Sequence, residues 1–249
     1  MNLKLFIMSK IGSILDYLIP SNKITEIRMG PIKGYKWIYG SSINACWLGI
    51  YEYSKAKKIA EFVHNGDVFF DIGAHVGYYT LLASKLVGKE GKVYAFEPFP
   101  RNIKLLKKHI FINNISNTKI FELALSNKIG QSFFTSNECN SMNHLTDIAG
   151  PNSIEVYVSS LDYLFDRGKI NKPSVIKIDV EGGEYEVLLG GKKLLIKSHP
   201  IIFLATHERM NPGVHNKCLN FLIQLGYEVI PIDGKAIEVS SELLCRYTK

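Results

Sequence analysis

Asp71 and Glu97 are acidic residues placed where they could bind a nucleoside ligand. Asp71 lies at the end of an apolar run that is followed by Gly73 and Gly77, and Glu97 directly follows a second apolar run. Glycines allow a tight turn from a strand into a helix, and the N–H groups at the start of that helix attract an anionic group. A carboxylate at the end of the next strand can accept hydrogen bonds from both ribose hydroxyls. The two segments therefore predict a nucleoside site at neighbouring strand ends.

The spacing of the glycines indicates which nucleoside. A dinucleotide fingerprint has three glycines, whereas this turn has two and carries His75 where the second of three would lie. The turn and the following Glu97 instead resemble motif I of S-adenosylmethionine-dependent methyltransferases. In that resemblance Asp71 serves the ammonium group of the cofactor, and the backbone from 74 to 77 serves its carboxylate. The alternative is that Asp71 only caps the helix and the glycines only turn the chain.

The elements that would position these residues are strands and helices in alternation. Short apolar runs predict the strands, and apolar residues at helical spacing predict the helices. Strands are expected near 68–71, 93–97, 119–125, 175–181 and 201–207, helices near 52–64, 76–86, 101–112, 182–189 and 212–225, and a closing antiparallel pair at 227–231 and 236–239. This alternation implies a mostly parallel sheet that binds ligands at the carboxyl ends of its strands.

An insertion separates the third and fourth predicted strands. It contains a short run at 132–135, a polar Ser/Asn stretch to about residue 143, and an alternating strand at 154–158. Long loops at strand ends often carry specificity, so we expect the insertion to contact the substrate.

The first 60 residues differ in their residue pattern from the remainder of the chain. Apolar residues recur at helical spacing from Leu3 to Leu18, which predicts an amphipathic helix ended by Pro20. That helix could pack on its own domain, or it could contact a membrane surface or a second subunit. The run is too interrupted to span a bilayer and lacks a signal-peptide cleavage site. We therefore divide the chain into an N-terminal helical extension (1–60) and a cofactor-binding catalytic domain (61–249).

The composition limits the class of protein but does not identify its binding partner. The 249 residues are 46% hydrophobic, enough for one sizeable core, and 30 Lys and Arg against 23 Asp and Glu give a net charge of +7. This balance favours anionic partners in general. Four widely spaced cysteines, Cys46, Cys139, Cys218 and Cys245, indicate neither a zinc ribbon nor a disulfide framework, so a reducing, cytoplasmic location is expected.

Several segments together resemble the FkbM family of methyltransferases. They lie in family order between residues 69 and 208 and read DIGAHVGYYT, VYAFEPFPRNIKLLKKHI, ALSNKIG, SLDYL, IKIDVEGGE and IIFLATHE. The resemblance implies a doubly wound, mostly parallel, seven-stranded sheet of the Rossmann-like kind. It also implies S-adenosylmethionine as cofactor and O-methylation of a hydroxyl on a sugar, glycan or glycosylated small molecule.

The resemblance also assigns cofactor-binding residues by position. The cofactor turn would use Asp71, Gly73, Ala74, His75 and Gly77, the ribose would be held by Glu97, and the adenine would be bordered by Pro98, Phe99, Leu123 and Ala124. The chain departs from the family pattern in three places. His75 replaces a common Asn, Gly183 a common Ala, and Ala205 a Glu that often precedes the histidine of the fifth strand.

Catalytic candidates follow the fourth and fifth strands. Asp179 and His207 end these strands, so both should open on the same crevice, and Glu181 lies two residues further on. Histidine titrates in the range that suits a general base, so we expect His207 to take the proton of the acceptor, oriented by a carboxylate. The set Asp179, Glu181 and Glu184 could alternatively hold a divalent metal, which we do not favour. Lys177, within an apolar strand, should either extend its ammonium group toward solvent or pair with a buried carboxylate rather than catalyse.

Two other functions stay open at this point. One is methylation of RNA on a ribose or base, suggested by the net charge, although no basic groove with aromatic residues is legible and nucleic acid is therefore not the expected partner. The other is a non-catalytic module that only binds S-adenosylmethionine. Membrane association through the N-terminal helix and the oligomeric state are also left open.

Overall fold

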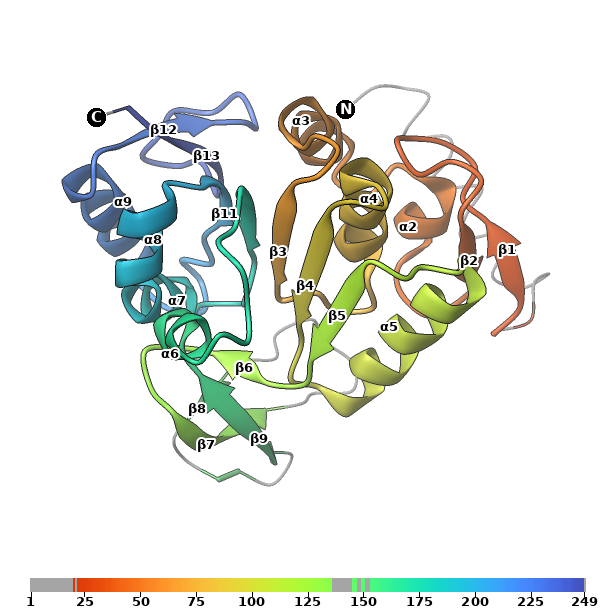
Figure 1. Ribbon diagram of the computed structural model, residues 1–249, viewed down its shortest axis with the longest axis horizontal. Coiled ribbons are helices and arrows are strands. Elements are labelled where there is room, and N and C mark those ends of the chain that lie inside the picture. The colour runs from red at the N-terminus through yellow and green to blue at the C-terminus, as the bar shows by residue number, and fades with distance from the viewer. Residues whose placement is uncertain (1–19, 21, 136–144, 147–148, 151–152, 249) are drawn as a thin grey trace.

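The computed structural model describes residues 20, 22–135, 145–146, 149–150 and 153–248. The N-terminal helix predicted from Leu3 to Leu18 and most of the polar stretch of the insertion lie outside these residues. Over the described ranges the molecule has one large sheet with helices on both faces and a small second sheet at one end (Figure 1).

Within the described residues, the large sheet contains seven strands, as the family resemblance implies. In spatial order they are β12 (Tyr227–Pro231), β13 (Glu242–Tyr247), β11 (Ile201–Ala205), β10 (Val175–Ile178), β3 (Val68–Ile72), β4 (Lys92–Phe96) and β5 (Thr118–Phe121). The five strands from β11 to β5 are mutually parallel, and β13 runs antiparallel to both its neighbours. The order reverses between β3 and β10, which is where doubly wound sheets bind ligands.

Helices cover the two faces in separate groups (Figure 1). One face carries α3 (Tyr53–Phe62), α4 (Tyr78–Val87) and α5 (Pro100–Ile112), and the other carries α6 (Leu161–Asp166), α7 (Glu184–Gly190), α8 (Lys192–Ser198) and α9 (Val214–Gln224). Successive strand residues point to opposite faces. Phe69 accordingly packs with Ile59 and Leu81, whereas Phe70 packs with Leu188 and Leu222.

The segment before α3 packs on the first of these faces. It contains β1 (Ile24–Glu26), β2 (Lys36–Ile38) and the short helix α2 (Asn44–Leu48), and β1 pairs with β2 in antiparallel fashion. Trp37, Trp47 and Leu48 are buried in the same cluster as Phe69 of the sheet. Residues before 60 and the sheet therefore share one core.

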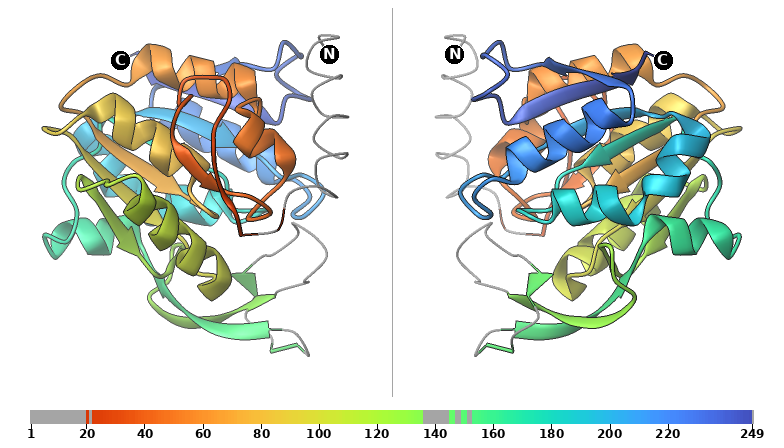
Figure 2. Two further views of the ribbon diagram at one scale, coloured as in Figure 1. Left: turned by 90° about the vertical axis from the view of Figure 1, so that its right-hand side faces the viewer. Right: turned by 90° about the vertical axis from the view of Figure 1, so that its left-hand side faces the viewer.

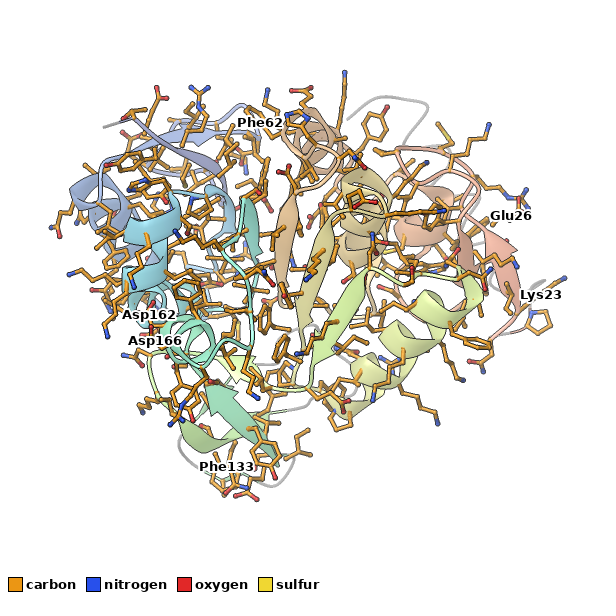
Figure 3. The ribbon with its side chains drawn as sticks, viewed as in Figure 1. Lys23, Glu26, Phe62, Phe133, Asp162 and Asp166 are labelled. Carbon is orange, nitrogen blue, oxygen red and sulfur yellow. The ribbon has the colours of Figure 1, made fainter. Side chains whose placement is uncertain are left out.

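The insertion forms the small second sheet. Its strands are β6 (Ala124–Leu125), β9 (Ser153–Ser159), β7 (Gly130–Thr135) and β8 (Leu145–Thr146), in that spatial order. The side views show it at the bottom of the molecule (Figure 2). The segment predicted to be a strand, 154–158, lies within β9, and the short run at 132–135 pairs with it as part of β7. Next to it, Asp162 of α6, labelled in Figure 3, accepts hydrogen bonds from the N–H groups of Lys193 (3.0 Å) and Leu194 (2.8 Å) at the start of α8.

Two strand predictions are wrong, one in the extent of the strand and one in its pairing partner. The apolar run 119–125 was predicted as one strand, but it leaves the large sheet after Phe121, and Ala124 and Leu125 then pair with β9. The predicted closing pair of 227–231 with 236–239 does not form, because β12 pairs with Glu242–Tyr247. Leu243 and Cys245 are fully buried there, whereas Val239 is 68% exposed. In both cases the strand is determined by burial and by pairing with a distant segment. A local pattern of apolar residues gives no information about either.

A buried ion pair joins the two strands at the point of reversal. Lys177 on β10 and Asp71 on β3 are register partners, and Lys177 Nζ lies 3.3 Å from Asp71 Oδ1. The Asp71 carboxylate is fully buried and also accepts a hydrogen bond from the Thr80 hydroxyl (2.6 Å). Lys177 donates to the carbonyl oxygen of Gly73 (2.8 Å). The expectation that Lys177 pairs with a buried carboxylate is confirmed.

We predict that Lys177→Met lowers the free energy of unfolding by about 3–5 kcal/mol, because Asp71 is left as a buried charge without its partner. The Asp71→Asn substitution keeps a group of similar size beside Thr80. The double variant should lose less stability than the sum of the two single losses, by about 0.5–3 kcal/mol, in urea unfolding. Additive losses would contradict a direct interaction between the two side chains.

His109 on α5 is a second buried polar link. Its Nε2 accepts a hydrogen bond from the backbone N–H of Ile38 (3.0 Å), its Nδ1 lies 2.7 Å from the Val76 carbonyl oxygen, and its ring stacks on Trp37. Nδ1–H therefore donates to Val76, and the ring is neutral. Burial lowers the pKa of His109 to about 4. The side chain thus ties β2 to the turn after β3.

The low pKa of His109 predicts a pH-dependent stability. Between the ordinary value of 6.5 and about 4 the unfolded chain binds a proton that the folded protein does not, so stability falls as pH drops through this range. We expect wild type to lose about 1–2 kcal/mol more than His109→Gln between pH 7 and pH 5 in urea unfolding. Equal losses in the two proteins would show that His109 does not carry this dependence.

Candidate active site

A cavity of about 710 Å³ lies at the carboxyl ends of β3, β4 and β10. This volume is within the range of small-molecule sites. Most of the residues predicted to form the site line it: Gly73, Ala74, His75, Glu97, Pro98, Leu123, Ala124, Asp179 and Glu181. Asp71, Gly77, Phe99 and His207 are not among the lining residues that the structure describes. Each contacts a lining residue, and the His207 side chain, which is 25% exposed, does so at Asp179 and Glu181.

The turn after β3 requires glycine at its first position. Gly73 has φ +76°, and a Cβ atom there would lie 1.8 Å from the carbonyl oxygen of Asp179. The turn therefore touches the end of β10 directly. Gly77, with φ +103°, lets α4 begin beside Leu106 of α5, where a Cβ would lie 2.5 Å from a methyl group. A side chain at Gly73 would collide with the backbone of Asp179, and one at Gly77 would displace the Leu106 side chain and strain the left-handed backbone.

His75 has a left-handed backbone conformation with φ +51°. Asn and His are among the non-glycine residues that adopt this conformation most readily, which explains why His can replace the Asn of the family pattern. Its backbone N–H donates to Glu97 Oε2 (2.8 Å). The His75 side chain is exposed to the cavity, and the surrounding protein together with the positive charges of Lys177 and Arg101 lowers its pKa.

Glu97 is held rigidly at the end of β4. Its side chain is 4% exposed, and its Oε1 accepts hydrogen bonds from Phe99 N (3.0 Å) and Asn102 Nδ2 (3.2 Å). Burial raises the pKa of Glu97. A carboxylate offers about four acceptor positions, and the protein donors, with His75 N, occupy three. Phe99 therefore acts on the site by fixing Glu97 through its backbone.

Asp179, Glu181 and Glu184 surround His207. The His207 Nδ1 lies 2.7 Å from Glu184 Oε1, and its Nε2 lies 3.5 Å from Asp179 Oδ1 and 3.6 Å from Glu181 Oε2. Burial opposes protonation of His207, but the Glu184 hydrogen bond and the charges of Asp179 and Glu181 outweigh it and raise the pKa to about 9. The orienting carboxylate expected for His207 is Glu184, which α7 supplies although Ala205 has replaced the usual acid on β11.

The carboxylate set suggested for a metal does not come together as predicted. Glu184 is fully buried and directs one oxygen to His207 and to the Gly182 N–H (2.9 Å). The donor atoms that lie within 4.8 Å of one another belong to Asp179, Glu181 and His207. Asp179 already faces two ammonium groups, so its charge does not call for a metal ion, and we assign none.

A lysine and two glutamates at this site were not predicted from the sequence. Lys55 of α3 lies 3.5 Å from Asp179 Oδ2, 3.1 Å from Glu52 and 2.9 Å from Glu242. Burial opposes its charge, but these carboxylates keep the ammonium protonated and raise its pKa well above the usual value. The spacing of residues in the helix could have indicated that Lys55 is buried, because it shares the buried face of α3 with Ala56 and Ile59.

Comparisons with known proteins identify the family of the chain. The Methyltransferase FkbM domain family matches residues 71–229. The hexuronic acid methyltransferase AglP of Haloferax volcanii is 27% identical over 165 residues, which cover 66% of this chain and 66% of that protein. The chain thus spans just under two thirds of that relative.

Solved structures show the same fold. The FkbM methyltransferase of Methylobacillus flagellatus matches with a TM-score of 0.51 and 13% identity, covering 85% of this chain and 56% of that one. A proposed rRNA-methylase of Clostridium thermocellum matches with a TM-score of 0.52 and 13% identity, covering 78% and 94%. The chain belongs to the FkbM family of methyltransferases, and its sheet is the Rossmann-like sheet of S-adenosylmethionine-dependent enzymes.

Proposed function

We propose that the protein is an S-adenosylmethionine-dependent O-methyltransferase that acts on a hydroxyl of a sugar, glycan or glycosylated small molecule. The observation that carries this proposal is one cavity whose lining joins the glycine turn and Glu97 to the carboxylates beside His207. The part of the cavity proposed to hold the cofactor, around Glu97, is therefore continuous with the part proposed to accept the proton, beside His207.

The cofactor half suits S-adenosylmethionine. Glu97 retains acceptor capacity toward ribose hydroxyls, and Pro98, Leu123 and Ala124 offer an apolar border for adenine. The turn from Gly73 to Val76 lines the cavity beside them, where the amino acid end would lie. When bound, the cofactor supplies its methyl carbon to the acceptor oxygen, and the carbon–sulfur bond breaks with its electron pair to leave S-adenosylhomocysteine.

His207 is proposed as the base for the acceptor hydroxyl. Its Nε2 lies farther from Asp179 and Glu181 than an ordinary hydrogen bond of about 2.7–3.2 Å, so it is available to a third partner between them. Neutral His207 would take the hydroxyl proton at Nε2 while Glu184 holds Nδ1–H. Asp179 and Glu181 would position the hydroxyl, and positioning supplies much of the rate in such displacements.

A sugar-like acceptor is favoured over RNA because AglP, the relative above, is named for methylation of a hexuronic acid. The aligned His207 and Glu184 favour a catalytic protein over a module that only binds the cofactor.

Location is proposed from composition alone. We propose a cytoplasmic protein, with peripheral membrane contact as the alternative if the helix predicted from Leu3 to Leu18, which lies outside the described residues, binds a membrane surface. No helix in the part of the chain that the structure describes combines the length and apolar character needed to cross a membrane.

The direct test is transfer of a labelled methyl group from S-adenosylmethionine. Neutral nucleotide sugars, uronic acids, polysaccharide fragments and RNA are offered in parallel, and products are read by mass. A gain of one methyl group on a sugar hydroxyl is expected. Transfer to RNA alone, or to none of these acceptors with the cofactor bound, would overturn the proposal.

Glu97→Gln should weaken S-adenosylmethionine binding by about 10- to 100-fold in calorimetry, since hydrogen bonds to a charged group are worth about 1.5–3 kcal/mol. The matched control is Glu90→Gln, an exposed residue after α4, which should bind as wild type does. Unchanged affinity in folded Glu97→Gln would remove Glu97 from the cofactor site.

A pH profile tests His207. Because the base must be neutral, and its pKa in the free protein is about 9, kcat/KM should rise with pH from 6 toward 9. His207→Ala should lower kcat by about a hundred- to ten-thousand-fold and flatten this rise. A variant with the wild-type slope and only a few-fold loss would exclude His207 as the base.

A further inference from the structure

Lys55 is a buried ammonium outside the segment that matches the family. It lies on α3, upstream of residues 71–229, and its side chain is 3% exposed. Glu242 on β13, one of its partners, lies downstream of the same segment. Lys55 nevertheless meets Asp179, which lines the cavity, and Glu242 is linked to Asp179 through Lys55. Parts of the chain on either side of the family domain therefore reach the site.

The contacts of Asp179 divide between its two oxygens. Oδ2 faces Lys55 (3.5 Å) and Lys177 (3.8 Å), whereas Oδ1 faces His207 Nε2 (3.5 Å). The two lysines also flank the ring of Tyr79, each with Nζ 5.5 Å from its centroid. Attraction of one oxygen by two fixed cations sets the orientation of the other toward His207.

Lys55 also separates carboxylates that would repel one another. Glu52 and Glu242 lie within 3.1 Å and 2.9 Å of its Nζ, and Tyr79 donates to Glu52 (2.6 Å). Burial raises the pKa of Glu242 to about 7. Without the ammonium, Asp179 would share this region with two other acidic groups and would retain Lys177 alone on Oδ2.

We propose that Lys55 is a positioning residue for methyl transfer, which holds the Asp179 carboxylate with Oδ1 directed at His207 and so makes helix α3 part of the active site. The inference rests on the proposed O-methylation at the same cavity. Lys55 does not contact the cofactor half around Glu97, so its effect should fall on turnover and leave cofactor binding unchanged.

The test compares Lys55→Met with Lys55→Arg and with Lys58→Met as a matched control. Lys58 is on the same helix and half exposed, and its ammonium group pairs with Glu61 and lies over the Phe62 ring. In Lys55→Met, kcat should fall about 100-fold, as expected for a small displacement of a catalytic group, with the acceptor KM changed less than threefold and the S-adenosylmethionine Kd unchanged. Lys55→Arg should restore kcat to within about tenfold of wild type, because it restores the cation, and Lys58→Met should match wild type.

Wild-type turnover retained in folded Lys55→Met would overturn the inference, and so would a loss confined to cofactor affinity. If Lys55→Met does not fold, Lys55→Met with Glu242→Gln removes one charge of each sign, and this double variant should fold and remain slow. A second test does not need the acceptor. In a crystal structure of Lys55→Met or of the double variant, Asp179 Oδ1 should turn away from His207. An unchanged Asp179 would contradict the inference, whereas absence of turnover in wild type would contradict only the proposed function.

Discussion

The relative position of the two halves of the site depends on the buried cation Lys177, which lies between the ends of two adjacent strands. Its ammonium group meets Asp71 on β3, Asp179 after β10 and the carbonyl oxygen of Gly73. An uncompensated charge at this depth costs several kcal/mol, so all these groups must be present together. The interaction therefore fixes the relative position of the cofactor turn and the catalytic carboxylate at the reversal point of the sheet.

The two halves of the cavity are coupled by this arrangement. Gly73 lies so close to the Asp179 carbonyl that no side chain fits between them. A shift of the cofactor turn would therefore move the carboxylate that faces His207, and the reverse holds as well. Methyl transfer needs donor carbon and acceptor oxygen in line, and a shared rigid backbone contact provides such alignment.

The sequence alone predicted the order of elements and the cavity lining better than the contacts among charged side chains. Motif residues such as Glu97 are local in the chain, and apolar strands ending on polar residues place them at one sheet edge. The pairing of Ala124 with β9, the use of Glu184 as the partner of His207, and the arrival of Lys55 from α3 depend on contacts across 34, 23 and 124 residues. Side-chain periodicity does not encode such pairings, because each requires the tertiary fold first.

A crystal structure with S-adenosylhomocysteine bound would show whether the cavity holds the cofactor in this way. We expect the ribose hydroxyls to bind Glu97, the amino acid end to lie over the turn that begins at Gly73, and the sulfur to face the cavity wall formed by Asp179 and Glu181. A ligand bound elsewhere, or one whose ribose does not meet Glu97 and whose sulfur points away from Asp179, would contradict it.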